Sequence, residues 1–160
     1  MPATFVKGDI FDEASDASRP GRRAIAFGAD CTGAMGAGVA AAIKKQWPAF
    51  AEAYAARCAG NKMQPGDVFA WNEGDLFVYA LGLHRGDIKP KISHFERALR
   101  AAVERAAHDE VPRVLLARFG AGKAAMDRLR VKRVLTEVGA STPVDVVFFE
   151  QFVRKAAATA

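Results

Sequence analysis

Two glycine-rich segments, each directly after a predicted strand and before a predicted helix, carry the clearest chemical signal. They span residues 33–38 (Gly-Ala-Met-Gly-Ala-Gly) and 119–123 (Phe-Gly-Ala-Gly-Lys). Glycines let backbone N–H groups approach an anion closely, and a helix N-terminus adds unpaired donors and a favourable dipole. Two such segments at one sheet edge could hold a diphosphate from both sides. Glycine-rich turns between a strand and a helix are, however, also common without any ligand. The Walker ending and the third glycine of a dinucleotide fingerprint are both missing.

Polar side chains near these segments each leave two interpretations open. Asp9 ends the first predicted strand, where a carboxylate can accept the exocyclic amine of a base or form an Asx-turn. Lys123 can neutralise a phosphate or point to solvent. Asp127 precedes the last predicted helix, where its ordinary role is an N-cap. Cys31 lies in a polar, glycine-rich loop, where a thiol is a candidate nucleophile with no obvious partner.

The composition predicts one folded domain, residues 1–154, with a frayed tail at 155–160. No apolar run approaches the roughly 20 residues of a membrane helix, and the first residues lack a signal-peptide pattern. We therefore expect a cytoplasmic protein with no membrane partner. Two cysteines and three scattered histidines predict neither a disulfide framework nor a metal site. The formal charge of +5 leaves open a solvated basic surface or nucleic-acid binding.

Short β-branched or aromatic runs alternate with helical patterns along the chain. The predicted strands are residues 4–6, 24–28, 68–72, 76–83, 114–117 and 144–149, and the predicted helices are residues 35–47, 48–58, 91–107 and 129–138. A tight turn at 73–75 predicts an antiparallel hairpin, and the apolar run at 144–149 predicts a central buried strand. Gly139 is expected to cap the last helix, and residues 12–23 are expected to be a polar turn region. The pattern predicts an α/β fold with a mixed sheet between helices.

The order and spacing of these pieces resemble the macrodomain family over nearly the full chain. The matching stretches are residues 6–10, 35–40, 43–45, 66–68, 89–90 and 119–122, together with Leu99 and Asp127. The chain is most similar to the class that holds the terminal ADP-ribose protein glycohydrolase and the antitoxin DNA ADP-ribosyl glycohydrolases. The marks of that class are Asp30-Cys31, Lys89-Pro90 and Asp127. The resemblance implies a three-layer α/β/α sandwich with a mixed six-stranded sheet, and ADP-ribose or an ADP-ribosylated macromolecule as ligand, with no cofactor.

The resemblance also implies roles for residues at matched positions. Asp9 would hold the adenine amino group, with the Ile10 backbone beside it. Phe149 or Phe152 could pack against adenine, with core packing favoured for Phe149. The other implied ligand contacts are Asp30, Met35, Gly36, Ala37, Gly38, Val39, Phe119, Gly120, Ala121, Gly122 and Lys123.

The chain departs from this class at the catalytic lysine. Class members that cleave ADP-ribose from proteins pair a lysine just after the fourth strand with an aspartate after the second glycine segment. An alignment through Asp75, Tyr79 and Leu81 places His84 at the lysine position, and Asp127 matches the aspartate. A histidine is suited to act as a base rather than to perform amine chemistry. We expect an ADP-ribosyl hydrolase in which Asp127 or His84 orients water. The alternatives are a non-catalytic ADP-ribose reader and a basic nucleic-acid-binding protein.

Overall fold

The computed structural model describes residues 3–15, 21–36, 38–118 and 126–152, without the side chains of residues 151 and 152. Strands and helices alternate along this part of the chain. The strands are β1 (Thr4–Gly8), β2 (Arg23–Asp30), β3 (Val68–Glu73), β4 (Leu76–His84), β5 (Arg113–Ala117) and β6 (Asp145–Phe152). The helices are α1 (Ile10–Ala14), α2 (Gly38–Gln46), α3 (Pro48–Cys58), the 3-10 turn η1 (Ala59–Asn61), α4 (Ile92–His108) and α5 (Arg128–Ala140).

The six strands form one mixed sheet in the order β1-β6-β5-β2-β4-β3. Five strands are parallel, and β3 pairs antiparallel with β4 at one edge. The predicted hairpin is confirmed, and Gly74 supplies the positive φ (59°) that its two-residue turn requires. The prediction that the last strand is internal is also confirmed, because β6 lies between β1 and β5. The carboxyl ends of the five parallel strands therefore share one edge of the sheet.

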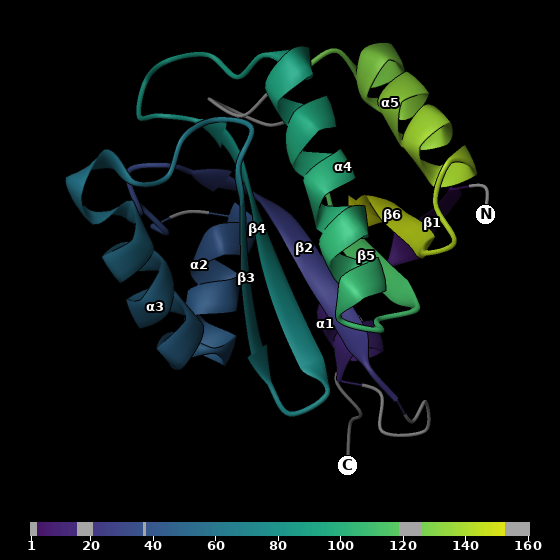
Figure 1. Cartoon of the computed structure of the whole chain (residues 1–160), viewed down its shortest axis with the longest axis horizontal. Coiled ribbons are helices and arrows are strands. Elements are labelled where there is room, and N and C mark those ends of the chain that lie inside the picture. The colour runs from purple at the N-terminus through teal and green to yellow at the C-terminus, as the bar shows by residue number, and fades with distance from the viewer. Residues whose placement is uncertain (1–2, 16–20, 37, 119–125, 153–160) are drawn as a thin grey trace.

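Helices cover both faces of the sheet, as Figure 1 shows for α4 and α5 on one side and α2 and α3 on the other. Side chains alternate along β2, so Ala24 and Ala26 join the core under α4 and α5. Ile25 and Phe27 join the second core, which packs against α1, α2 and α3. The three-layer α/β/α sandwich is confirmed.

The largest differences from the predicted boundaries occur in three segments. Helix α2 begins at Gly38 rather than at residue 35, because Met35 turns into the core before a positive-φ residue (Gly38, 59°). Strand β6 begins at Asp145 and continues to Phe152. The expected turn region at 12–23 starts too early, because the short helix α1 continues to Ala14.

Gly139 does not cap α5, which corrects a second expectation. The helix continues to Ala140, and Ser141 is its C-cap. A Cβ atom at Gly139 would lie 2.7 Å from the Ala3 backbone nitrogen. The glycine therefore permits the chain just before β1 to pass close to α5, and it serves packing rather than helix termination.

Candidate functional site

The shared edge of the parallel strands collects several of the predicted site residues. Asp30 is the last residue of β2 and stands opposite His84, the last residue of β4. Gly8, just before Asp9, is paired with Phe152 at the end of β6. In open α/β sheets, ligands bind outside the carboxyl ends of parallel strands. The topology thus brings Asp9, Asp30 and His84 to the edge where such sites form.

Asp30 ties the ends of β2 and β4 together. Its Oδ1 accepts hydrogen bonds from the Thr32 N–H at 2.9 Å and from the Gly86 N–H at 3.0 Å. The Cys31 N–H donates to the His84 carbonyl at 2.8 Å, and the Tyr54 hydroxyl donates to the Asp30 carbonyl at 2.8 Å. Burial alone would raise the pKa of Asp30, but the hydrogen bonds to its carboxylate outweigh burial and lower it. Asp30 is therefore an ionised structural bridge as well as a candidate ligand contact.

His84, at the end of β4, is the residue that pairs with Asp30 across the two strands. Its side chain is buried, and Nδ1 lies 2.9 Å from the Gly86 carbonyl oxygen. A carbonyl can only accept, so this hydrogen bond requires a proton on Nδ1. The neutral ring then carries its lone pair on Nε2, which is the atom able to act as a base.

Asp9 makes the local turn-type hydrogen bonds that were favoured for it, and it also caps a short helix that was not predicted. Its Oδ1 accepts from the Phe11 N–H at 3.0 Å and from the Asp12 N–H at 3.3 Å, which makes it the N-cap of α1. The Ile10 side chain is buried in the core, so only its backbone can face a ligand at this edge. Adenine recognition by Asp9 stays a prediction, and any variant at this position must preserve the cap to test it.

Asp127 is also a helix N-cap, which was one of its two expected roles. Its Oδ1 accepts from the Leu129 N–H at 2.9 Å and from the Arg130 N–H at 3.2 Å at the start of α5. The side chain is exposed. A carboxylate that caps a helix can still contact a ligand through its second oxygen, so the catalytic role of Asp127 stays a prediction.

The first glycine segment combines one tightly packed glycine with two open ones. Gly33 has a φ of 92°, and a Cβ there would lie 3.3 Å from Cys58 Cβ on α3. A Cβ at Gly36 or Gly38 would meet nothing within 4 Å. Met35 is 6% exposed and packs in the core, so its side chain is not available to a ribose or diphosphate. The open surface of this segment is formed by the backbone around Gly36 and Gly38, with Val39 half-buried behind it.

Two of the residues considered for the site, Cys31 and Phe149, have side chains buried in the core. Cys31 is fully buried rather than exposed in a loop, and burial, with Cys58 nearby, raises the pKa of its thiol to about 12. Such a thiol is not a nucleophile at neutral pH, which argues against the candidate nucleophile role of Cys31. Phe149 is 4% exposed and packs in the core under α1, α2 and α3, which confirms its favoured role.

Several predicted contacts lie outside the described residues. These are Ala37, Phe119, Gly120, Ala121, Gly122, Lys123 and the side chain of Phe152. In the described ranges, no group of three or more His, Cys, Asp or Glu side chains could hold a metal ion. No helix of the same ranges is long and apolar enough to cross a membrane.

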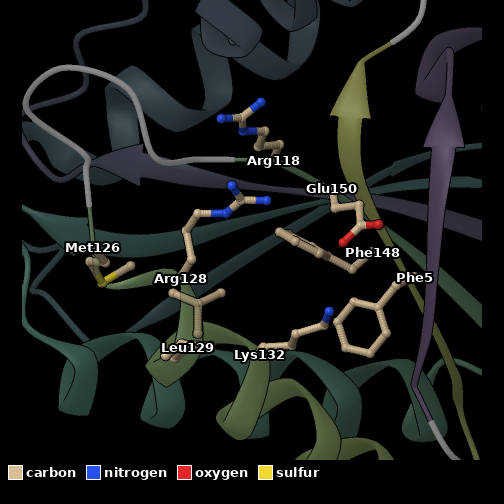
Figure 2. A pocket seen from close by; sticks show the side chains of 9 residues that line it. Phe5, Arg118, Met126, Arg128, Leu129, Lys132, Phe148 and Glu150 are labelled. Carbon is tan, nitrogen blue, oxygen red and sulfur yellow. The ribbon is translucent and has the colours of Figure 1, made fainter.

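Sequence reasoning missed two features near this edge. One is the pairing of Asp30 with the Gly86 N–H, which no local pattern signals because 56 residues separate them. The other is a cavity of about 360 Å³ between β1, β6 and the start of α5, lined in part by Phe5, Arg128 and Lys132 (Figure 2). The basic stretch at 128–133 was its only sequence signal.

Comparison with known proteins gives the same fold over nearly the whole chain. The macrodomain of Thermus aquaticus DarG aligns with a TM-score of 0.79 at 23% identity, covering 92% of this chain and 97% of that one. The macrodomain of Mycobacterium tuberculosis DarG aligns with a TM-score of 0.78 at 20% identity, covering 91% and 95%. A macrodomain protein from Streptomyces coelicolor aligns with a TM-score of 0.74 at 25% identity, covering 96% and 99%.

A curated relative and a family model extend the comparison to sequence. The chain is 38% identical over 61 residues to an ADP-ribose 1''-phosphate phosphatase of Meyerozyma guilliermondii. That match covers 38% of this chain and only 33% of the relative. The Macro domain model matches residues 27–135, which is more than half of the chain and includes both Asp30 and Asp127. The chain therefore belongs to the Macro domain family.

Proposed function

We propose that this protein binds ADP-ribose at the carboxyl edge of its sheet and hydrolyses the bond between ADP-ribose and a modified protein or nucleic acid. One observation carries the proposal: five parallel strands bring Asp9, the first glycine segment and the start of α5 to a single edge. Family membership supplies the ligand class, since a solved relative, Thermosipho africanus DarTG, is described in complex with ADP-ribose. This chain spans only 43% of the length of that relative, so the full activity of the relative is not assigned to this chain.

The glycine segment supports a diphosphate contact through backbone atoms. Gly36 and Gly38 leave open space where a side chain would otherwise stand, just before the first turn of α2. A helix N-terminus adjacent to exposed backbone N–H groups favours a negative group. The Asp30 bridge to Gly86 would hold this segment in place relative to the end of β4. In this arrangement Asp30 positions the loop.

Hydrolysis would need a base for water and a proton for the leaving group. Water would attack the anomeric carbon of the ribose as the bond to the modified group breaks. The water proton would pass to His84 Nε2 or to the Asp127 carboxylate, and the leaving group would be protonated in turn. The hydrogen bond from His84 Nδ1 to Gly86 supports the role of Nε2 as the basic atom.

Binding is tested by titrating ADP-ribose into the protein by calorimetry. Asp9→Ala removes both the α1 cap and the proposed adenine contact, so it cannot separate them. Asp9→Ser keeps a capping oxygen and loses the carboxylate. We expect Asp9→Ser to keep the thermal stability of the wild type and to weaken binding about tenfold, as loss of a charge-assisted hydrogen bond does. Undiminished binding by Asp9→Ser would remove Asp9 from the site.

Turnover is tested with ADP-ribosylated protein, ADP-ribosylated DNA and ADP-ribose 1''-phosphate as separate substrates. Asp127→Ser keeps the α5 cap without the carboxylate, and His84→Gln replaces the basic ring with an amide. We expect one of the two variants to lose at least about a hundredfold in kcat, the usual contribution of a general base. Release of no product from any of the three substrates by the wild-type protein would refute hydrolysis.

A reader of ADP-ribose is the second candidate. It is favoured by His84, which is buried and hydrogen-bonded to Gly86 at the position where hydrolases of the class use a lysine. It is also favoured by Asp127, whose carboxylate is engaged as a helix cap. Stoichiometric binding without product over hours, unchanged in Asp127→Ser, would identify a reader.

A further inference from the structure

The cavity between β1, β6 and the start of α5 lies on the α5 face of the sheet, away from the first glycine segment. It has a volume of about 360 Å³, within the range of small-molecule sites. Its walls come from β1, β6, Arg118 just after β5, Met126 just before α5, and the first two turns of α5. Figure 2 shows Arg128 and Lys132 extending from α5 toward the sheet, with Arg118 above them and Glu150 on β6 opposite.

The charges around this cavity are unbalanced. Arg118, Arg128 and Lys132 face a single carboxylate, Glu150. Among the described residues, no hydrogen bond or ion pair engages the guanidinium group of Arg118 or Arg128. By contrast, Arg133, one turn further along α5, pairs with Glu137 at 3.4 Å. Two guanidinium groups beside one concave surface, neither paired within the described part of the chain, favour an anion, and a guanidinium fork suits phosphate oxygens in particular.

The remaining wall is apolar and partly aromatic. The Phe5 and Phe148 rings meet edge to face at 6.1 Å, and Lys132 Nζ lies 4.9 Å from the Phe5 centroid. Leu129 completes the opposite wall and is 79% exposed, the largest exposure among the described bulky apolar side chains. A leucine this exposed at the mouth of a basic cavity offers contact area to a flat apolar group.

We propose that this cavity is a second ligand site, which binds a nucleoside 5'-phosphate. The phosphate would lie between Arg118 and Arg128, and the base would lie between Leu129 and the Phe5–Phe148 wall. Glu150 would accept a hydrogen bond from a ring N–H or exocyclic amine of the base, which favours guanine because guanine presents two adjacent donors to one carboxylate. An inorganic anion would leave the apolar wall and Glu150 without a partner, so the lining fits a ligand with both an anionic and an aromatic part.

This proposal is independent of ADP-ribose binding, and the experiment keeps the two apart. GMP is titrated into the ¹⁵N-labelled full chain at saturating ADP-ribose, and amide shifts are followed by NMR. We expect saturable shifts at Leu129, Lys132 and Glu150. We also expect ribose 5-phosphate to bind at least about fivefold more weakly than GMP, because it lacks the base.

Two charge-matched double variants test the geometry. Arg128→Gln with Lys132→Gln removes two cavity cations, and Arg130→Gln with Arg133→Gln removes two cations of the same helix that do not line the cavity. All four side chains are exposed, so both variants should fold, which thermal unfolding verifies. We expect the first variant to weaken GMP binding at least about tenfold and the second less than about twofold.

Four outcomes would overturn the proposal. They are the absence of saturable shifts at millimolar GMP, displacement of GMP by ADP-ribose, equal affinity for ribose 5-phosphate, and equal losses in the two double variants. Equal losses would indicate diffuse attraction to a basic helix. Glu150→Gln refines the assignment: a reduced preference for GMP over ribose 5-phosphate supports the base contact, and an unchanged preference contradicts it.

Discussion

The two ends of the site edge, one after β2 and β4 and the other after β5 and before α5, are built in different ways. At the β2–β4 end, Asp30 receives two backbone N–H groups, and the Cys31 N–H is bonded to the end of β4. At the β5–α5 end, Asp127 caps its own helix, and Leu129 is exposed. One end is fixed by hydrogen bonds between distant segments, while the described part of the other presents side chains to solvent.

This difference shows where substitutions should affect folding and where they should affect only binding. Substitutions at the β2–β4 end remove hydrogen bonds or packing contacts between different elements. Changes at the β5–α5 end alter local capping or open surface. Five predictions test this contrast with unfolding free energies, from the largest expected effect to the smallest.

Gly82→Ala should cause the largest loss of stability. A Cβ at Gly82 would lie 2.8 Å from the Gln64 carbonyl oxygen and 2.9 Å from Cys31 Sγ, both closer than atoms can pack. We expect a loss of about 3 kcal/mol, the upper part of the range for overpacked cores, measured by urea denaturation. Gly36→Ala is the matched control, since its Cβ would meet nothing within 4 Å. Equal stability of the two variants would contradict the close packing at the β2–β4 end.

Asp30→Ala should rank second. It removes the acceptor of the Thr32 and Gly86 N–H groups, and we expect a loss of about 2 kcal/mol, as for hydrogen bonds to a charged group. Asp30→Asn keeps an acceptor oxygen and should lose less. If the asparagine variant is as unstable as the alanine variant, the charge rather than the hydrogen-bond geometry holds the two loops.

The same carboxylate predicts a pH dependence with a defined sign. The pKa of Asp30 is lower in the folded state than in the unfolded chain, where an aspartate has a pKa of about 3.9. Its contribution is therefore fully present above about pH 4 and is lost as the pH falls through the folded pKa. The stability difference between wild type and Asp30→Asn should shrink in this acidic range, measured by denaturation between pH 7 and pH 3. A difference that grows as the pH falls would contradict the lowered pKa.

Asp127→Ala should have a smaller and purely local effect. It removes the N-cap of α5, which typically contributes about 1 kcal/mol, and Asp127→Ser should restore most of it. The comparison separates the cap from any chemistry of the carboxylate, because the serine variant retains only the cap. A loss that serine fails to restore would show that Asp127 makes a tertiary contact at the β5–α5 end.

Leu129→Ala should have the smallest effect. Because Leu129 is 79% exposed, truncation removes little buried area and should change the unfolding free energy by less than about 0.5 kcal/mol. Val131→Ala, two residues further along α5 where the side chain is 5% exposed, is the control and should cost more. A large loss in Leu129→Ala would mean that another part of the chain covers this leucine.

Much of the fold was predictable because its signals are local. The apolar stripe of α4, with Phe95 and Leu99 on one face, follows from spacings of three and four residues. Pro48 predicted the start of α3 correctly, because proline suits a first helical turn. The cap of α5 by Asp127 was also among the expected roles, whereas the short helix α1, which Asp9 caps, was not predicted.

Two residues have roles that depend on a distant neighbour and that the sequence did not indicate. Gly139 resembles a helix cap in sequence, but the approach of Ala3 determines its role. Cys31 lies next to polar and glycine residues in sequence, yet the close contact with Gly82 on β4 encloses its thiol. Neither contact leaves a local pattern, because the paired residues are separated by most or much of the chain.

The sequence by itself determined the alternation of strands and helices, the hairpin and the family, since these depend on periodicity, turn residues and the order of short motifs. Only the tertiary structure decided that Asp30 bonds to Gly86, that His84 is buried with Nδ1 beside the Gly86 carbonyl, and that a basic cavity opens beside α5. The physical reason is distance along the chain. Backbone conformation responds to near neighbours, whereas burial, hydrogen-bond partners and cavities arise only when segments far apart in sequence pack together.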